Sequence, residues 1–184
     1  MDAPSAGIRR ADKVMPEAAA TELLARGFSG RLATVGPDGW PYIVPLLYVW
    51  RAGEIWVHNA GVRGHLRVNV DHDARVCFEM DEPGEVFAYG RFECDTSVEY
   101  RSVVVFGRIR VVEERDAKVR FFDALMAKYG DPAWQRPAGS YPRLEGITLY
   151  SIAVERMTGK ETVLPAASQR WPAADRTASP DARP

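Results

Sequence analysis

The sequence predicts an α+β fold in which about six mainly antiparallel strands form a closed or partly closed β-barrel with flanking helices. Most of the chain alternates with the period of two that β-strands show, whereas residues 116–129 repeat apolar side chains at helical spacing. Residues 40–50 are apolar on both faces, so both faces of this strand should be covered. A barrel interior on one side and a ligand or second subunit on the other would cover them.

The first half of the chain divides at glycine and proline residues. We expect, in order, a helix over 15–26, a strand over 31–35, a turn at 37–39, a strand over 40–50, a turn at 52–53, a strand over 54–59 and a short helix over 65–71. Pro41 and Pro45 cannot donate hydrogen bonds to a neighbouring strand, which indicates either an edge position or an interrupted ladder. In the short helix, Leu66 and Val70 should face the interior.

The second half of the chain is expected to contain four more strands and one long helix. The strands are predicted over 75–80 and 85–91, over 100–112 with a close approach at Gly107, and over 147–155 after a Pro-rich loop. Asp116 should cap a helix that ends at Gly130. The buried stripe of this helix should comprise Val119, Phe122, Leu125, Met126 and Tyr129.

A single domain is predicted over residues 12–164, between a flexible arm over 1–11 and a disordered tail over 165–184. The chain has 24 basic and 25 acidic residues, a balance that argues against a nucleic-acid partner. We find no apolar signal segment and no run near the roughly 20 apolar residues of a membrane helix. The two cysteines, Cys77 and Cys94, form no recognisable framework, which favours a reducing cytoplasm.

The common catalytic motifs are absent from the sequence, including the Walker loop, GxGxxG after a strand, HExxH and GxSxG. His58, His65 and His72 lie seven residues apart, which does not place three ligands on one face of a strand or helix. No metal site is therefore predicted, and no catalytic residue can be named. The residues alone predict a barrel-like domain with an aromatic-rich site.

Four segments form an ordered pattern: Arg31 to Val35, Trp40 to Tyr48, Ile55 to His65, and Arg75 to Glu79. In this order and spacing they resemble the Nim-type, nitroimidazole-resistance branch of the pyridoxamine 5′-phosphate oxidase-like flavoproteins. Residues 94–107 and 158–160 fit the same pattern, so the resemblance spans roughly residues 10–160. It implies an FMN-binding split β-barrel and a homodimer with two FMN sites between its subunits.

The resemblance implies that the FMN phosphate is held by the loop after the third strand and by the helix that follows. The loop suits an anion, because Gly61 and Gly64 let backbone N–H groups approach and a helix start adds positive potential. Arg63 and His65 supply further donors. Nim-type relatives usually carry Gly-His-Lys where this chain has leucine in the third place, which implies either a weaker affinity for phosphate or compensation by Arg63 or Arg67.

Further cofactor contacts are implied outside the loop. His58 and Asn59 end the third strand, where related oxidases contact the phosphate or the ribityl chain. Ser102 lies where they carry a polar residue against the flavin, and a buried hydroxyl in an apolar strand needs a partner. In the family, the backbone of one strand contacts the isoalloxazine ring, and the resemblance places Leu46, Leu47 and Tyr48 on that strand. The alternative role for these residues is the core of the barrel.

The function that the resemblance implies is an FMN-dependent oxidoreductase that passes electrons from a nicotinamide donor to a small acceptor, with nitroaromatics as one candidate acceptor. One alternative is a flavin- or haem-binding protein without turnover, in which His58 or His65 would ligate haem. Another is a deazaflavin-dependent reductase on the same fold. The near-neutral charge argues against the deazaflavin reductase, because the acidic tail of that cofactor favours a more basic groove.

Overall fold

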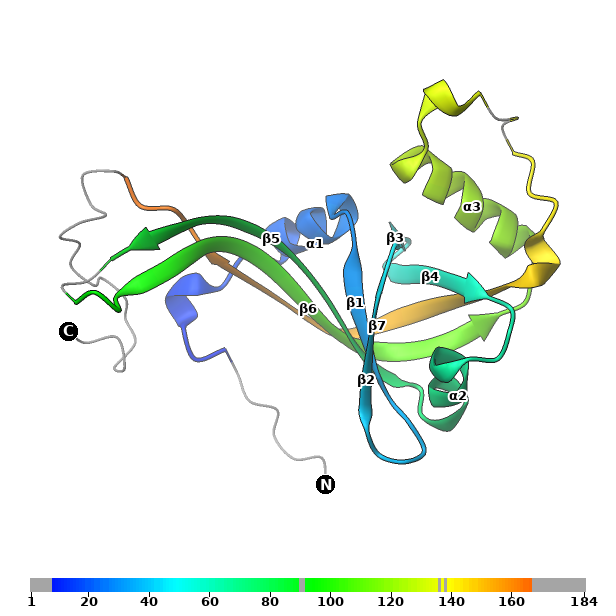
Figure 1. Ribbon diagram of the computed structural model, residues 1–184, viewed down its shortest axis with the longest axis horizontal. Helices are drawn as coiled ribbons and strands as arrows, with labels where there is room; N and C mark the ends of the chain where they lie inside the picture. The colour runs from blue at the N-terminus through cyan, green and yellow to red at the C-terminus, as the bar shows by residue number, and fades with distance from the viewer. Residues whose placement is uncertain (1–7, 90–91, 136, 138, 167–184) are drawn as a thin grey trace. The chain divides into compact units, whose positions relative to one another are not determined.

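The computed structural model describes residues 8–89, 92–135, 137 and 139–166 (Figure 1). Its helices are α1 (Glu17–Arg26), α2 (His65–His72) and α3 (Arg115–Tyr129), with 3-10 turns η1 (Ala11–Lys13), η2 (Pro132–Trp134) and η3 (Leu144–Gly146). Its strands are β1 (Gly30–Val35), β2 (Pro41–Leu46), β3 (Val49–Arg51), β4 (Glu54–Ala60), β5 (Arg75–Ala88), β6 (Thr96–Val112) and β7 (Ile147–Thr162). No helix in these ranges is long and apolar enough to span a membrane. Positions 1–7 of the predicted arm and 167–184 of the predicted tail lie outside the described residues.

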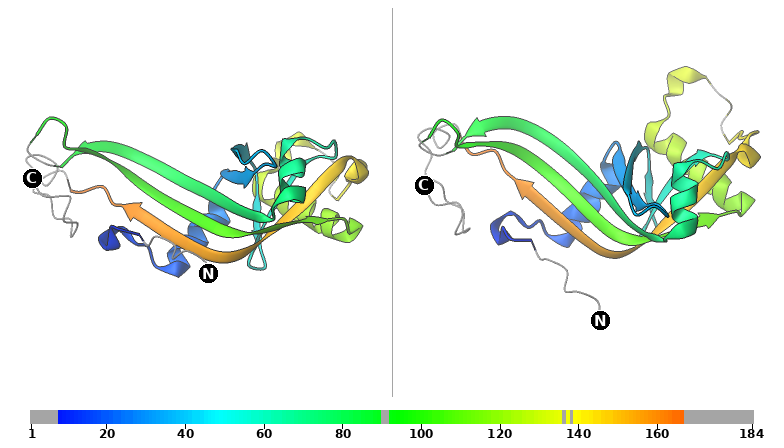
Figure 2. Two further views of the ribbon diagram at one scale, coloured as in Figure 1. Left: turned by 90° about the horizontal axis from the view of Figure 1, so that it is seen from below. Right: turned by 60° about the horizontal axis from the view of Figure 1, so that its bottom comes forward.

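The strands form one sheet with the order β2-β1-β5-β6-β7-β4-β3, so β2 and β3 lie at its two ends. Figure 2 shows β5, β6 and β7 as long neighbouring strands. The pairs β1–β2, β1–β5, β3–β4 and β4–β7 are all antiparallel. The predicted α+β class is confirmed, with seven strands in place of about six.

The single strand predicted over 40–50 is wrong, because this stretch forms two strands, β2 and β3. Tyr48 lies in the break between them, where its side chain is fully buried and its hydroxyl donates to the Leu24 carbonyl at 2.5 Å. The buried Tyr48 therefore separates β2, which pairs with β1, from β3, which pairs with β4. The edge position predicted from Pro41 and Pro45 is confirmed, since β2 ends the strand order.

Several strand boundaries also differ from the predictions. In place of the two strands predicted over 75–80 and 85–91, the single strand β5 runs from Arg75 to Ala88 through the polar residues between them, and positions 90–91 of the second prediction lie outside the described residues. Likewise, β6 begins at Thr96 rather than at residue 100, and β7 continues to Thr162 rather than ending at 155. Backbone hydrogen bonds between strands do not require apolar side chains. These strands therefore extend beyond the residues whose apolar–polar alternation predicted them.

The long helix α3 is present where it was predicted, but its cap and buried face differ. Its N-cap residue is Glu114, without a side-chain cap, and Asp116 lies in the first turn. Gly130 ends the helix as predicted. The buried residues are Ala117, Lys118, Phe121 and Leu125, whereas Met126 of the predicted stripe is exposed. The helix is therefore rotated so that Phe121, rather than Phe122, lies deepest in the core.

The chain divides into two compact units, each with its own contacts. The first unit comprises Met1–Leu23, Asp81–Val103 and Thr158–Pro184, and the second comprises Leu24–Met80 and Val104–Met157. In the first unit, the Met15 N–H donates to the Gly159 carbonyl at 3.0 Å, and a Cβ at Gly159 would press on Ala20. In the second unit, one core cluster joins α3 to the sheet and consists of Val49, Val112, Ala117, Phe121, Leu125 and Leu149.

Two glycine predictions concern the second unit, and both are confirmed. A Cβ at Gly107 would fall on the backbone carbonyl oxygen of Ala153, so this position requires the close approach that glycine allows. The turn at 52–53 joins β3 to β4, with Ala52 at φ 51° and Gly53 at φ 78°. Positive φ at both positions is the geometry of a tight hairpin, and Ala52 adopts it at a steric cost.

Candidate functional site

The loop between β4 and α2 is the region to which the sequence assigned phosphate binding. The Gly61 N–H donates to the Gly146 carbonyl at 2.8 Å, so it is not available to an anion as the sequence reasoning expected. Gly64 is the N-cap of α2 and provides no side-chain cap, and a Cβ there would meet nothing within 4 Å. The first N–H groups of α2 therefore have no capping side chain from the N-cap residue.

Two arginines, Arg63 just before α2 and Arg67 in its first turn, share the carboxylate of Asp71 in the last turn of the helix. Arg63 Nη1 is 2.7 Å from Asp71 Oδ2, and Arg67 Nε is 2.9 Å from Asp71 Oδ1. The hydrogen bond to Asp71 raises the pKa of Arg67 above its usual range. A guanidinium has five N–H donors, so both arginines keep donors for another anion while Asp71 fixes their positions.

The helix itself is fixed to the sheet by a buried polar contact. Asn69 Nδ2 donates to Thr34 Oγ1 of β1 at 3.0 Å, and both side chains are buried. Leu66 and Val70 face the interior, which confirms the prediction for these two residues. On the other side of the helix start, the ring of His65 lies 5.1 Å from that of Tyr42 on β2.

Position 66, where Nim-type relatives have lysine, belongs to the core of the second unit. The Leu66 side chain is only 6% exposed. Its burial explains why an apolar residue fits there, and it leaves Arg63 and Arg67 as the basic side chains nearest the helix start. Arg63 and Arg67, which the sequence named as substitutes for the lysine, both pair with Asp71.

His58 and Asn59 point to opposite faces of β4, as adjacent strand residues do. The His58 ring packs 5.3 Å from Phe121 and 5.1 Å from Phe122 of α3, and burial lowers its pKa. Asn59 Oδ1 accepts a hydrogen bond from the Tyr150 hydroxyl at 3.3 Å. The structure therefore does not bring these two residues to one contact surface.

The residues predicted beside the isoalloxazine ring have three different environments. Leu46 is half-buried at the end of β2, Leu47 is exposed, and Tyr48 is core. The Tyr48 carbonyl accepts from the Tyr129 hydroxyl at 2.9 Å and from Lys128 Nζ at 3.3 Å. Burial lowers the pKa of Lys128 to about 8. The Tyr48 backbone is thus engaged by α3, which leaves Leu46 and Leu47 as the open part of this segment.

Ser102 belongs to the first unit, whereas the other eight predicted site residues belong to the second. Its hydroxyl donates to the Lys160 carbonyl at 3.5 Å, which provides the partner that a half-buried hydroxyl needs.

Sequence reasoning missed three polar residues around α2, namely Asp71, Asn69 and Thr34. Asp71 could have been found, because it follows Arg67 by four residues and so lies on the same helix face. The contact of Asn69 with Thr34 joins positions 35 residues apart, and no local pattern predicts it.

Comparisons with known proteins agree on the fold. The sequence model described as pyridoxamine 5′-phosphate oxidase matches residues 16–161, and no curated protein matches the chain. Among solved structures, a candidate 5-nitroimidazole antibiotic resistance protein from Bacteroides thetaiotaomicron is 18% identical with a TM-score of 0.66, covering 80% of this chain and 85% of its own. An FAD and heme binding protein from Mycobacterium smegmatis is 21% identical with a TM-score of 0.69, covering 86% and 78%. The flavocytochrome Anf3 from Azotobacter vinelandii is 14% identical with a TM-score of 0.68, covering 83% and 70%.

Proposed function

The chain belongs to the pyridoxamine 5′-phosphate oxidase family, and we propose that it is an FMN-binding flavoprotein whose phosphate site is the start of α2. The observation that carries this proposal is the uncapped N-terminus of α2, with Arg63 just before it and Arg67 in its first turn, both paired with Asp71 in the last turn of the helix. Helix N-terminal N–H groups and guanidinium groups are the donors that a phosphate dianion prefers. The residues present therefore fit the cofactor that the fold family implies.

Each residue of the site has a distinct role in this proposal. Arg63 and Arg67 bind phosphate oxygens, and His65 adds a donor on the side of Tyr42. Asn69, through Thr34, holds the helix in register with the sheet so that these donors stay in position. Positioning of this kind is the main contribution of a protein to a flavin, which itself supplies the electron-transfer chemistry when bound.

We further propose that the protein is an oxidoreductase that passes electrons from a nicotinamide donor to a small acceptor, of which nitroaromatic compounds are one class. The support is the family and the similarity to the Bacteroides resistance protein. Purified protein loaded with FMN should oxidise NADH or NADPH in the presence of an acceptor. FMN-bound protein that transfers electrons from no donor to any acceptor would contradict this activity and leave a binding protein.

The cofactor itself is tested by the absorption spectrum of freshly purified protein, followed by heating and identification of the released compound. Flavin absorption with FMN released is the expected result. Release of FAD would retain a flavoprotein but overturn the assignment of FMN. A protein that is colourless and takes up neither flavin would overturn the proposed site.

A haem-binding function without turnover is the second candidate, and one observation favours it. His58 Nδ1 is buried without a hydrogen-bond partner among the described residues, and burial keeps the imidazole neutral, the form that ligates iron. A similar structure is that of an FAD and heme binding protein. A Soret band in the same spectrum, lost in His58→Ala, would support this function.

A homodimer is also part of the proposal. The end of β2 exposes apolar surface, with Trp40 74% and Ile43 61% exposed, and β2 is an end strand of the sheet. Exposed apolar side chains at a sheet edge are typical of an interface. Light scattering should give a dimer mass, and Ile43→Glu should weaken both dimerisation and FMN binding. A monomeric variant with unchanged FMN affinity would contradict a site shared between subunits.

A further inference from the structure

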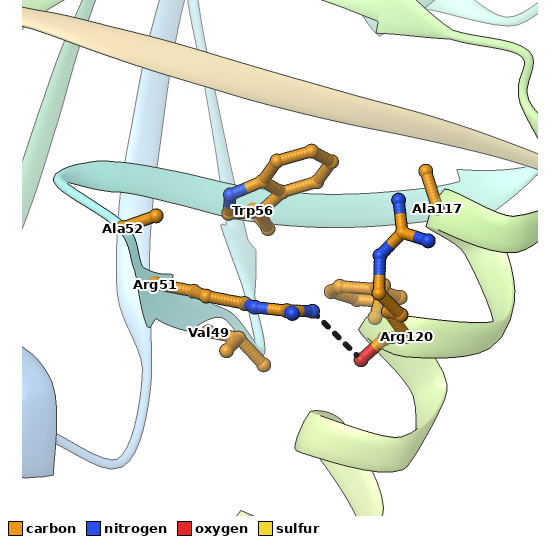
Figure 3. Close-up of a pocket in the computed structure, with 7 residues that line it drawn as sticks. Val49, Arg51, Ala52, Trp56, Ala117 and Arg120 are labelled. Carbon is orange, nitrogen blue, oxygen red and sulfur yellow. Dashed lines mark hydrogen bonds between the residues drawn. The ribbon is translucent and has the colours of Figure 1, made fainter.

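A second region with two arginines lies in the hairpin β3–β4 and the facing side of α3. The residues there surround a cavity of about 200 Å³ (Figure 3). Its lining residues are Val49, Arg51, Ala52, Trp56, Ala117, Arg120 and Phe121. All of them belong to the second unit, and none belongs to the proposed phosphate site.

The charge of this cavity is one-sided. Among the described residues, Arg51 and Arg120 are the only charged ones that line it, and Arg51 Nη1 donates to the Arg120 carbonyl at 3.4 Å. Neither guanidinium forms an ion pair with a carboxylate within the described ranges of the chain. Nearby Glu54 is paired with Arg110 at 3.5 Å. Two like charges beside one cavity repel each other, and an anion between them would remove that cost.

The remaining wall is apolar and aromatic, and an unused donor lies behind it, because the Trp56 indole nitrogen is buried. Figure 3 shows the Trp56 indole and the Arg51 side chain extending from the hairpin beside the side chains of α3. Trp56 Nε1 is buried without a hydrogen-bond partner among the described residues. Ser151, directly opposite Trp56 on β7, also has a buried hydroxyl without a partner in this part of the structure. A buried donor is costly unless an oxygen accepts its hydrogen bond.

The size of the cavity limits what could occupy it. Since one water takes about 30 Å³ of liquid volume, the cavity holds roughly seven waters or one single-ring organic molecule. Inorganic phosphate would satisfy the arginines but leave the half-buried Trp56 ring without an apolar ligand surface, whereas Phe121 is only 2% exposed and packs in the core. A molecule with both a carboxylate and a flat apolar body matches both halves of the wall.

We propose that this cavity binds a small aromatic carboxylate, with the carboxylate held by Arg51 and Arg120 and the ring against Trp56. The site is separate in residues from the proposed flavin site and does not depend on flavin binding. Benzoate is the simplest probe of this ligand class.

The test is a titration of the full chain with benzoate, followed by the ¹H–¹⁵N signals of the indole N–H groups. The chain has five tryptophans, and Trp56→Phe assigns the signal that matters. A saturable shift of the Trp56 signal is expected, with and without added FMN. Arg120→Gln and Arg51→Gln should each weaken benzoate binding about tenfold or more, since charge-assisted hydrogen bonds are lost.

Arg108→Gln is the matched control, because Arg108 is an exposed arginine paired with Glu155 at 2.7 Å and does not line the cavity. It should leave benzoate affinity unchanged, and benzamide, which lacks the charge, should bind about tenfold more weakly than benzoate. Three results would overturn the proposal: no saturable shift of the Trp56 signal, equal affinity in the arginine variants and the control, or phosphate binding as tightly as benzoate. A protein that fails to take up FMN but shows the shift would overturn only the flavin site.

Discussion

The two places where arginines gather in the second unit are built in opposite ways. At the start of α2, Arg63 and Arg67 share Asp71, whereas at the β3–β4 hairpin Arg51 and Arg120 have no carboxylate between them. A shared carboxylate fixes two guanidinium groups before a ligand arrives and leaves the group with one net positive charge. Unpaired arginines depend on the ligand to offset their repulsion. The first arrangement suits a permanently bound cofactor, and the second suits a ligand that exchanges.

The largest expected effect concerns Leu66, which distinguishes this chain from its lysine-bearing relatives. Leu66→Lys should lower the free energy of unfolding by about 2 to 4 kcal/mol, because it removes a buried apolar side chain and buries an amine. Denaturant unfolding measures the loss. Arg67→Lys, at a half-buried position of the same helix, is the control and should cost less than about 1 kcal/mol. A Leu66→Lys protein of unchanged stability with tighter FMN binding would show that position 66 faces the phosphate.

The next effect separates the two arginine groups by their ligands. Arg63→Ala and Arg67→Ala should each weaken FMN binding about tenfold to a hundredfold, since each removes a charge-assisted hydrogen bond to phosphate. Arg51→Ala and Arg120→Ala should leave FMN affinity within about twofold. Flavin fluorescence quenching measures all four. Equal losses at both groups would erase the distinction between the two regions.

The pH dependence of stability sharpens the description of the α3 side. His58 has its pKa lowered by burial, so the unfolded chain binds a proton at higher pH than the folded chain does. Stability should therefore be complete above the ordinary histidine pKa of about 6.5 and fall as the pH decreases below it. His58→Phe should remove this part of the dependence, and the exposed His72→Gln should not. Chemical unfolding of both variants at a series of pH values measures whether only His58→Phe removes the pH dependence.

The smallest effect concerns the hairpin turn that carries Arg51. Ala52 adopts φ 51°, and asparagine tolerates this conformation better than alanine does. Ala52→Asn should raise the free energy of unfolding by about 0.5 to 1 kcal/mol, with benzoate affinity unchanged or improved. Thermal unfolding provides the measurement. A decrease in stability would indicate that the turn does not hold this backbone in solution.

Most individual elements of the fold could be predicted from local sequence, but their pairing could not. The turn at Ala52-Gly53, the short helix after Gly64 and the end of α3 at Gly130 follow from glycine positions. The division of residues 40–50 into β2 and β3 depends on Tyr48, whose hydroxyl reaches Leu24 in the core. That contact joins distant parts of the chain, so periodicity within eleven residues could not reveal it.

The candidate site was predictable to a similar degree. The sequence could predict phosphate-binding groups at Arg63, Gly64 and His65, because these residues are consecutive and their hydrogen-bonding groups are evident from residue type. The partners that decide what these residues can do are Asp71, Asn69 and Tyr42, and two of these contacts come from other parts of the fold. The cavity with Arg51 and Arg120 left no sequence signal, since its two arginines are 69 residues apart.

The sequence by itself determined the family, the α+β class and the presence of a glycine- and arginine-containing loop before a short helix. These follow from neighbouring residues, whose propensities and spacing act locally. Only the tertiary structure decided that Gly61 is committed to Gly146, that His58 faces α3, and that a cationic cavity lies beside Trp56. Packing brings together residues that are far apart in the chain. Burial then decides which of their polar atoms form hydrogen bonds within the protein and which stay available to a ligand.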